Sequence, residues 1–319
     1  MAKDKMEKEK NFVSAVIYVH DDAGEIEDFL GKIMETFENN FLQSEIICVD
    51  DGSSDASRDI IRKVSGQASS TNISLLTMSG YHGVERAMVA GVDLAIGDFV
   101  FEFDRVQGDF SPDTIMAVYR KSLTGYDIVS AVPEGKTSLS SKLFYFLFRK
   151  FRPEAMQSPM QTERFRILSR RAINRVSSMN KTIPYRKAVY MASGFPQGSV
   201  SYTPDAQGKE NAHSHEERRY REHVAVDALL LFTDVGYRFA MFLTGLMMCV
   251  TVFVAGYVVF TYFTQSPAAG WTTTIGFLSL AFFALFAILT IIVKYLQIIL
   301  GLIFRRKEVS FEGIEKLTK

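Results

Sequence analysis

The sequence contains few cysteines and no excess of charge of either sign. Two cysteines among 319 residues, Cys48 and Cys249, argue against a disulfide framework or a cysteine-based metal site and fit a reducing compartment. Lysine and arginine total 36, as do aspartate and glutamate, so no global charge points to nucleic acid or to an acidic partner. Residues 1–10 are mostly charged and lack an apolar run, so we predict a disordered tail and not a signal peptide.

Charge is missing altogether from one long stretch. No Asp, Glu, Lys or Arg occurs between Arg238 and Lys294, over about 55 residues, which is enough for two membrane spans of about 20 residues each. Pro267 and Gly270 mark the break between them. A buried hairpin in a soluble core is the alternative, but such helices are rarely so long and so apolar on every face. We therefore predict two transmembrane helices within 239–304.

Basic residues flank this stretch and are absent from its central loop. The positive-inside rule then places both flanks in the cytoplasm. We predict a multi-pass protein of the cell (inner) membrane, with a cytoplasmic domain at 11–205, a loop and juxtamembrane helix at 206–238, and a cytoplasmic tail at 305–319. The flanking cations are Arg218, Arg219, Arg221 and Arg238 before the stretch, and Arg305, Arg306 and Lys307 after it.

An acidic turn follows a buried strand near the start of the chain. Residues 46–49 are apolar and mostly β-branched, and the run stops at Asp50, Asp51 and Gly52. Similar runs at 13–19, 73–78 and 128–131 alternate with helical patterns, which indicates an α/β fold. Ligands of open α/β sheets bind beyond the carboxyl ends of strands, where a carboxylate can bind a base or a ribose. The alternative is an acidic turn in which Asp55 favours the following helix N-terminus, and spacing alone does not decide.

Three motifs resemble glycosyltransferase family 2, which has the GT-A (Rossmann-like) fold and uses nucleotide-sugar donors. V-D-D-G-S-S-D at 49–55 is similar to the family's nucleotide-binding segment. A-I-G-D-F-V at 95–100 matches the phrase that leads into the metal-binding strand, and Gly83, Ala87 and Gly91 match a G-x-x-x-A-x-x-x-G helix. The resemblance implies a hexosyltransferase domain over 11–205.

The resemblance also implies where a nucleotide sugar would bind. Tyr18 and Asp22 stand where the family's first strand ends in a turn that contacts the base. Asp50 and Asp51 would hold the nucleoside. Arg86 lies near the opening of a helix, where it can approach the diphosphate or simply face solvent.

The metal-binding D-x-D motif of the family is altered in this chain. Two carboxylates two residues apart would hold Mg²⁺ or Mn²⁺ against the donor diphosphate. Here Glu102 and Asp104 share a strand face, but Val106 occupies the place of the second aspartate. We expect Asp104 to be the ligand, with Glu102 or Asp109 beside it. Arg105 is the alternative, because a guanidinium can neutralise phosphate charge without a metal.

Several features point to a lipid-linked acceptor. Residues 139–152 combine four cations with many aromatics, which is typical of a helix in the headgroup layer and resembles the juxtamembrane helix of polyprenyl-phosphate glycosyltransferases. Residues 161–171 overlap the family's G-D-F-R-L-x-[SD]-R segment. From this resemblance we assign Asp104, Glu163 and Arg166 to catalysis. The residues predicted to meet the acceptor phosphate are Lys136, Arg166, Arg218, Arg219 and Arg221.

Most of the chain is similar to the dolichol-phosphate mannosyltransferase and bactoprenol glucosyltransferase group. This implies transfer of one sugar from a nucleoside diphosphate sugar to polyprenyl (undecaprenyl) phosphate in glycan or cell-wall biosynthesis. Because the group often assembles through its membrane helices, we also expect a homo-oligomer. The alternative is a catalytically degenerate membrane protein that binds nucleotide sugars as a scaffold partner, since Val106, Pro133 and Arg164 replace charged or acidic residues of the family.

Overall fold

A computed structural model of the chain describes residues 7–135, 162–179 and 185–205, the strand at 311–316, and shorter pieces elsewhere. It divides into two units, of which the first holds Met1–Tyr145, Glu154–Ala225 and Arg306–Lys319 and the second Phe146–Pro153 and Val226–Arg305. Lys136, the 218–221 cations, and most of the predicted helices at 139–152 and 239–304 lie outside the described residues. Within the described part, no helix combines the length and hydropathy of a membrane span.

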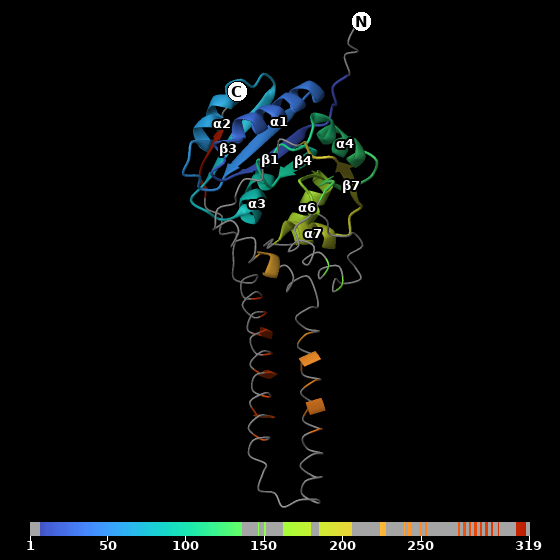
Figure 1. The fold of residues 1–319 in the computed structure, drawn as a ribbon. Coiled ribbons are helices and arrows are strands. Elements are labelled where there is room, and N and C mark those ends of the chain that lie inside the picture. The colour runs from blue at the N-terminus through green and yellow to red at the C-terminus, as the bar shows by residue number, and fades with distance from the viewer. Residues whose placement is uncertain are drawn as a thin grey trace, which may run out of the picture. The chain divides into compact units, whose positions relative to one another are not determined.

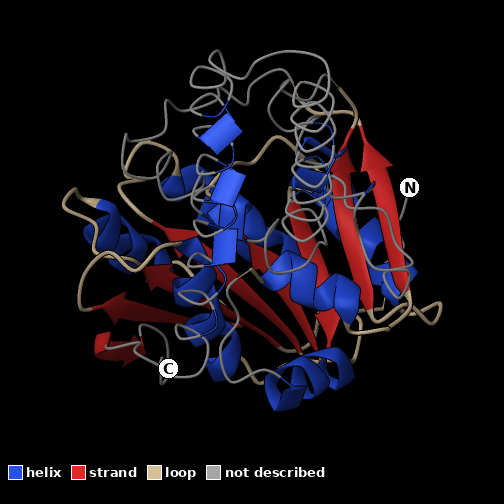
Figure 2. Ribbon diagram, turned by 90° about the horizontal axis from the view of Figure 1, so that it is seen from below, coloured by secondary structure: helices blue, strands red, loops and turns tan. Residues whose placement is uncertain are grey.

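Eight strands of the described chain form one mixed sheet in the order β7-β5-β6-β4-β1-β2-β3-β8 (Figures 1 and 2). β6 runs antiparallel to β4 and β5, and β8 runs antiparallel to β3, while the other pairings are parallel. The predicted α/β class and the four predicted strands are confirmed. The strands are β1 (Val13–Val19), β2 (Ser44–Asp50), β3 (Thr71–Met78), β4 (Phe99–Phe103), β5 (Ile128–Pro133), β6 (Phe165–Ser169), β7 (Gln197–Tyr202) and β8 (Phe311–Lys316).

Helices cover both faces of this sheet. Figure 1 shows α1, α2 and α4 on one face and α3, α6 and α7 on the other. All seven residues of β1 are buried, as expected for a strand covered on both sides. The helices are α1 (Ile26–Asn40), α2 (Ser57–Ser65), α3 (Val84–Leu94), α4 (Pro112–Ser122), α6 (Arg170–Met179) and α7 (Arg186–Ala192).

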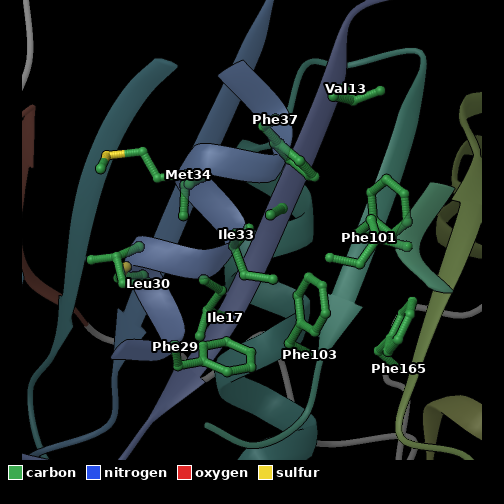
Figure 3. Close-up of a cluster of buried hydrophobic side chains, with 14 of the residues drawn as sticks. Val13, Ile17, Phe29, Leu30, Ile33, Met34, Phe37, Phe101, Phe103 and Phe165 are labelled. Carbon is green, nitrogen blue, oxygen red and sulfur yellow. The ribbon is translucent and has the colours of Figure 1, made fainter. Parts of the chain in front are cut away.

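The main hydrophobic core lies between α1, α4 and the sheet (Figure 3). α1 presents a stripe of apolar residues, among them Phe29, Ile33 and Phe37, because side chains three and four apart share a helix face. Phe103 of β4 packs edge-on against Phe29, with ring centroids 5.5 Å apart. This aromatic layer holds β4, the strand that Asp104 directly follows.

α3 lies unusually close to the opposite face of the sheet. A Cβ added at Gly91 would come within 2.4 Å of Val16 and 2.6 Å of Val49. Only glycine fits such an approach, so the small residues noted in this helix do permit close packing. The N-terminus of α3 is thereby held against the carboxyl ends of β1 and β2.

Both ends of the predicted glycosyltransferase domain need correction. Glu9, assigned to a disordered tail, pairs with Phe41 in an isolated β-bridge. The predicted tail at 305–319 contains β8, which pairs with β3. The reason is that β3 would otherwise leave a row of backbone groups unpaired at the sheet edge. The first unit therefore takes in chain from both sides of the apolar stretch.

Candidate active site

The candidate site lies at the carboxyl edge of the sheet, where the strand order reverses. β1 pairs with β2 on one side and with β4 on the other. Such a switch point is where open α/β sheets bind ligands. Turns after these strands bring together His20–Asp22, Asp51–Ser57 and Gly80–Gly83, and Asp104 follows the neighbouring strand β4.

Asp51 organises the turn between β3 and α3. Its carboxylate accepts hydrogen bonds from the backbone N–H of His82 (2.8 Å) and of Gly83 (2.7 Å), and from the Tyr18 hydroxyl (3.1 Å). The side chain is fully buried. Tyr18 and Asp51 thus meet as a pair, but this carboxylate faces backbone N–H groups and not the solvent.

Asp50 is buried as well. Its Oδ2 pairs with Arg58 Nε of α2 at 2.6 Å. Asp22 accepts a hydrogen bond from the His20 backbone N–H at 2.9 Å and lies at the start of α1. Neither Asp50 nor Asp51 exposes its carboxylate, so in this conformation neither can make the predicted direct contact with a nucleoside. Arg86, in the first turn of α3, stays partly exposed.

The glycine of the acidic turn is required by its conformation. Gly52 has φ +73°, and a Cβ there would lie 2.9 Å from the Gly80 carbonyl carbon. Asp21, also at positive φ, accepts hydrogen bonds from the backbone N–H groups of Ser54 (2.7 Å) and Asp55 (3.3 Å). Asp55 in turn accepts from Ser57 N–H at 2.9 Å, which is the helix-start role considered for it. The bonds from Asp21 link the turn after β1 to the turn after β2.

At the end of β4 the carboxylates are paired with arginines. Glu102 Oε2 lies 2.7 Å from Arg166 Nη1 and 2.9 Å from Arg186 Nη1. Asp104 Oδ2 lies 2.8 Å from Arg166 Nη2, and its Oδ1 lies 2.5 Å from Arg186 Nη2. Both guanidiniums are almost completely buried, whereas the Asp104 side chain is 30% exposed. Asp104 is therefore the carboxylate of this cluster that a ligand can reach.

Two further residues, on α3 and α7, complete this cluster. Glu85 Oε2 of α3 pairs with Arg186 Nε at 3.1 Å, and the Tyr190 hydroxyl donates to Glu102 Oε1 at 2.7 Å. We call Glu85, Glu102, Asp104, Arg166, Arg186 and Tyr190 the ionic cluster. Burial raises the pKa of Tyr190 well above its usual range, as does the charge of Glu102, so the hydroxyl stays a donor. Burial also raises the pKa of Glu85, which Arg186 opposes only in part.

The ionic cluster keeps Asp104 charged. Burial alone would raise its pKa, but the charges of Arg166 and Arg186 outweigh burial and hold the pKa of Asp104 far below its usual range. The predicted role of Arg166 in binding the acceptor phosphate is not available in this conformation, because its guanidinium bonds Glu102, Asp104 and Glu163.

The residues predicted as metal ligands do not fit a divalent cation as they are arranged here. Glu102 is fully buried and both of its oxygens have partners. Asp109 pairs with Arg164 Nη2 at 2.5 Å and accepts from Tyr202, so it does not turn toward Asp104. Among the described residues, no group of three or more His, Cys, Asp or Glu could hold a metal ion.

A small cavity adjoins the ionic cluster and is lined by residues of β5, β7 and α7. It has a volume of about 130 Å³. Glu163 lines it and bonds Ser130, Arg166 Nε (3.0 Å) and, more loosely, Lys187 Nζ (3.6 Å). Burial works against the charge of Glu163, yet Arg166 and Lys187 keep its pKa below the usual range. Glu163 is therefore an anion at neutral pH and a poor proton donor. The remaining lining is Ile128, Val132, Tyr190, Met191, Gln197, Gly198 and Ser199.

Sequence reasoning missed the residues that complete the cluster. Arg186, Lys187 and Tyr190 lie on α7, and Glu85 lies on α3. The signal for Arg186 was Tyr185-Arg186-Lys187, which echoes a basic segment of the family but gives no partner. Glu85 carried no signal, because a glutamate in the first turn of a helix is ordinarily a surface residue.

Known proteins share this sequence pattern and fold. Residues 14–177 match the model of "Glycosyl transferase family 2". A glycosyltransferase of Synechocystis is 27% identical over 62% of this chain, and YkcC of Bacillus subtilis is 24% identical over 82%. An undecaprenyl-phosphate 4-deoxy-4-formamido-L-arabinose transferase of Edwardsiella ictaluri is 30% identical over 39%. The matches span 63%, 81% and 38% of these relatives, so the chain covers less than two thirds of the first and third.

Solved structures give the fold alone. A glucosyl-3-phosphoglycerate synthase of Mycobacterium tuberculosis, in complex with Mn²⁺, UDP-glucose and phosphoglyceric acid, matches with a TM-score of 0.51 at 14% identity, over 69% of this chain and 79% of its own. A mannosyltransferase of Pyrobaculum calidifontis, in complex with GDP-Man and Mn²⁺, matches with a TM-score of 0.50 at 15% identity, over 90% and 89%. The sheet is GT-A-like, and the family match covers more than half of the chain, so this chain belongs to glycosyl transferase family 2, as its motifs indicated.

Proposed function

We propose that this protein transfers one sugar from a nucleoside diphosphate sugar to a polyprenyl phosphate at a membrane surface. The observation that carries the proposal is the position of Asp104. It is a partly exposed carboxylate at the β1/β4 switch point, and one guanidinium, that of Arg166, separates it from the cavity lined by Glu163. Relatives that act on undecaprenyl phosphate and neighbours that bind UDP-glucose or GDP-Man support the same two substrate classes.

The chemistry requires little of the protein beyond positioning. A phosphate oxygen of the acceptor forms a bond to the anomeric carbon while the bond from that carbon to the donor diphosphate breaks. The nucleoside diphosphate then leaves with the electron pair. Because the acceptor phosphate is already ionised, no general base is needed, which agrees with a Glu163 whose lowered pKa makes it a weak base. Holding both substrates in line supplies most of the rate gain.

We assign the cavity beside Glu163 to the transferred sugar. Its lining offers Ser130, Lys187, Gln197 and Ser199 as hydrogen-bonding groups around apolar residues, which is typical of a sugar subsite. The nucleoside would lie across the turns after β1 and β2, with Arg86 nearest to the diphosphate. Lys136 and the 218–221 cations stay our proposal for the acceptor phosphate.

Two observations support a membrane location. The described residues between 239 and 299 include large apolar side chains that are exposed, such as Phe242 (67%) and Phe253 (76%), and exposed apolar surface of this extent marks a membrane or protein contact. In addition, the chain leaves the first unit before Val226 and returns to it by Arg306. A segment that starts and ends in one folded unit crosses a membrane an even number of times.

The resulting arrangement is two spans with both flanks on the cytoplasmic side, where nucleotide sugars are available. The basic flanks support the same orientation. Assembly into a homo-oligomer through these spans belongs to the proposal as well.

A lipid-transfer assay tests the function. Membranes that contain the full chain are incubated with a panel of radiolabelled nucleoside diphosphate sugars and undecaprenyl phosphate, and label is measured in the organic phase. We expect label from one donor, lost in Asp104→Ala and retained in Asp113→Ala, a matched control because Asp113 is exposed in the first turn of α4. Nucleotide binding without labelled lipid from any donor would contradict transfer and favour the scaffold alternative.

A further inference from the structure

In the part of the chain that the structure describes, the carboxylates at the three positions predicted for a metal are each paired with arginine. Glu102 and Asp104 share Arg166 and Arg186, and Asp109 has Arg164. We infer that this chain holds no divalent cation at Glu102 and Asp104, and that the guanidiniums of Arg166 and Arg186 take the charge-balancing place of that ion. The inference rests on the proposed function only in so far as it describes how the same donor site works.

The first argument is that the carboxylate oxygens of Asp104 and Glu102 already have partners within the protein. Asp104 receives a different guanidinium on each oxygen, at 2.8 and 2.5 Å. Glu102 receives Tyr190 on one oxygen and both arginines on the other. A dication needs hard oxygen ligands without competing cations. Here an ion at Asp104 would lie within a few ångströms of two positive charges in a poorly hydrated site, where like charges repel strongly.

The second argument is that the arginines cannot easily turn away. Arg186 is completely buried and also bonds Glu85 through its Nε and its backbone N–H. Arg166 is 4% exposed and also bonds Glu163. Releasing Asp104 would therefore leave a buried guanidinium short of a partner, which is costly.

The third argument is that, among the described residues, the other two positions predicted to complete the site do not supply a ligand. Val106, in the place of the family's second aspartate, is 3% exposed and belongs to the hydrophobic core. Asp109 is 3% exposed and is held by Arg164 and Tyr202. Val106 therefore offers no carboxylate, and Arg164 places a cation on the carboxylate of Asp109.

The consequence concerns donor binding. The diphosphate would meet a site whose acid residues are already neutralised within the protein, so it needs no metal to shield it from Asp104. The partly exposed Arg86 then supplies positive charge from the N-terminal end of α3.

The test measures Mn²⁺ binding by the full chain directly, through the loss of the free-ion electron paramagnetic resonance signal. We expect the wild type to bind no Mn²⁺ that depends on Asp104, so its signal matches that of Asp104→Asn. We also expect a chelator to change the dissociation constant for UDP or GDP by less than about twofold. Stoichiometric Mn²⁺ binding that disappears in Asp104→Asn would overturn the inference.

A second variant tests whether the Arg186 guanidinium excludes Mn²⁺ from Asp104. Arg186→Gln removes one charge beside Asp104, and we expect at least about a tenfold gain in Mn²⁺ affinity. The matched control is Arg171→Gln, because Arg171 pairs with Asp127 but is 70% exposed and lies outside the ionic cluster. If a folded Arg186→Gln chain gains no affinity, the inference fails. If that variant does not fold, the wild-type comparison with Asp104→Asn still decides.

Failure of this inference can be told apart from failure of the proposed function. Lipid labelling that a chelator abolishes and Mn²⁺ restores would overturn metal independence while supporting transfer. Absence of labelling together with metal-independent nucleotide binding would contradict transfer while supporting metal independence.

Discussion

The two acidic clusters of the site are neutralised in different ways. Asp51, after β2, is surrounded by two backbone N–H groups and a hydroxyl. Glu102 and Asp104, on and after β4, are surrounded by two guanidiniums. In the first cluster the carboxylate fixes the shape of a turn. In the second it balances charge, and each member depends on the others.

An aspartate that follows a strand can therefore have either of two structural roles, which depend on the kind of donor around it. Two of the three donors to Asp51 are backbone N–H groups, which mutation does not remove, so the first cluster depends mainly on Asp51. The second cluster joins α3, β4, β6 and α7 mostly through pairs of charged side chains. Removing one arginine there takes a partner from several carboxylates at once. The two clusters should therefore respond differently to substitution.

The largest effect should come from Arg186→Met. It removes the guanidinium that pairs with Glu85 and one of the two that pair with Glu102 and Asp104, and we expect the free energy of unfolding to fall by about 3–5 kcal/mol. Denaturant titration of the purified chain measures the loss. The matched control is Arg62→Met, because the Arg62–Asp59 pair is exposed on both sides and should contribute less than about 1 kcal/mol.

A loss from Arg186→Met as small as that of the control would show that the ionic cluster is hydrated and not charge-balanced from within. Adding Glu85→Gln to Arg186→Met should recover part of the loss, because it removes one stranded charge. No recovery would mean that Glu85 is not coupled to the cluster.

A smaller effect is expected for Asp51→Ala. Three donors lose their acceptor, and an unsatisfied buried donor costs about 1–3 kcal/mol, but relaxation of the turn should limit the total to about 3 kcal/mol. The same denaturant titration applies, with the exposed Asp28→Ala as control. Asp51→Asn should lie between the two, because its amide keeps one acceptor oxygen. Equal stability of Asp51→Ala and Asp28→Ala would remove Asp51 from the organisation of the turn.

The smallest effect should appear on acidification. The pKa values of Asp104 and Glu163 are lowered in the folded chain from ordinary values of 3.8 and 4.5. The unfolded chain therefore binds protons first as the pH falls below about 5, and stability present at neutral pH is lost toward pH 3. Asp104→Asn should show a shallower decline in melting temperature than the wild type. Glu85, with its raised pKa, contributes in the opposite direction. Because the charge of Asp104 is one cause of that raised pKa, Asp104→Asn also reduces this opposing contribution. Parallel declines would contradict a charged Asp104.

Local pattern accounts for most of the fold that could be predicted. The strands at 13–19 and 73–78 follow from short apolar runs, and the start of α4 follows from Ser111, whose hydroxyl accepts from the Thr114 N–H at 3.3 Å. Tyr18 and Asp51 were predicted for one site and do meet. These features depend on residues near in sequence or on the common edge of parallel strands.

The features that were not predicted depend on contacts between residues far apart in the sequence. β8 pairs with β3 across more than half of the chain, and a pattern of side chains does not name the partner of an edge strand. Arg166 was assigned to a phosphate because arginine suits phosphate and carboxylate equally.

Periodicity and short motifs are local properties of the chain, so the α/β alternation, the acidic turns after the strands and the family could be predicted from the amino-acid order alone. The neutralisation of Glu102 and Asp104 by Arg166 and Arg186 could not, because it depends on which strands and helices become neighbours in the folded chain. A buried charge is paired with the opposite charge that lies nearest in space, and spacing along the chain does not give that distance.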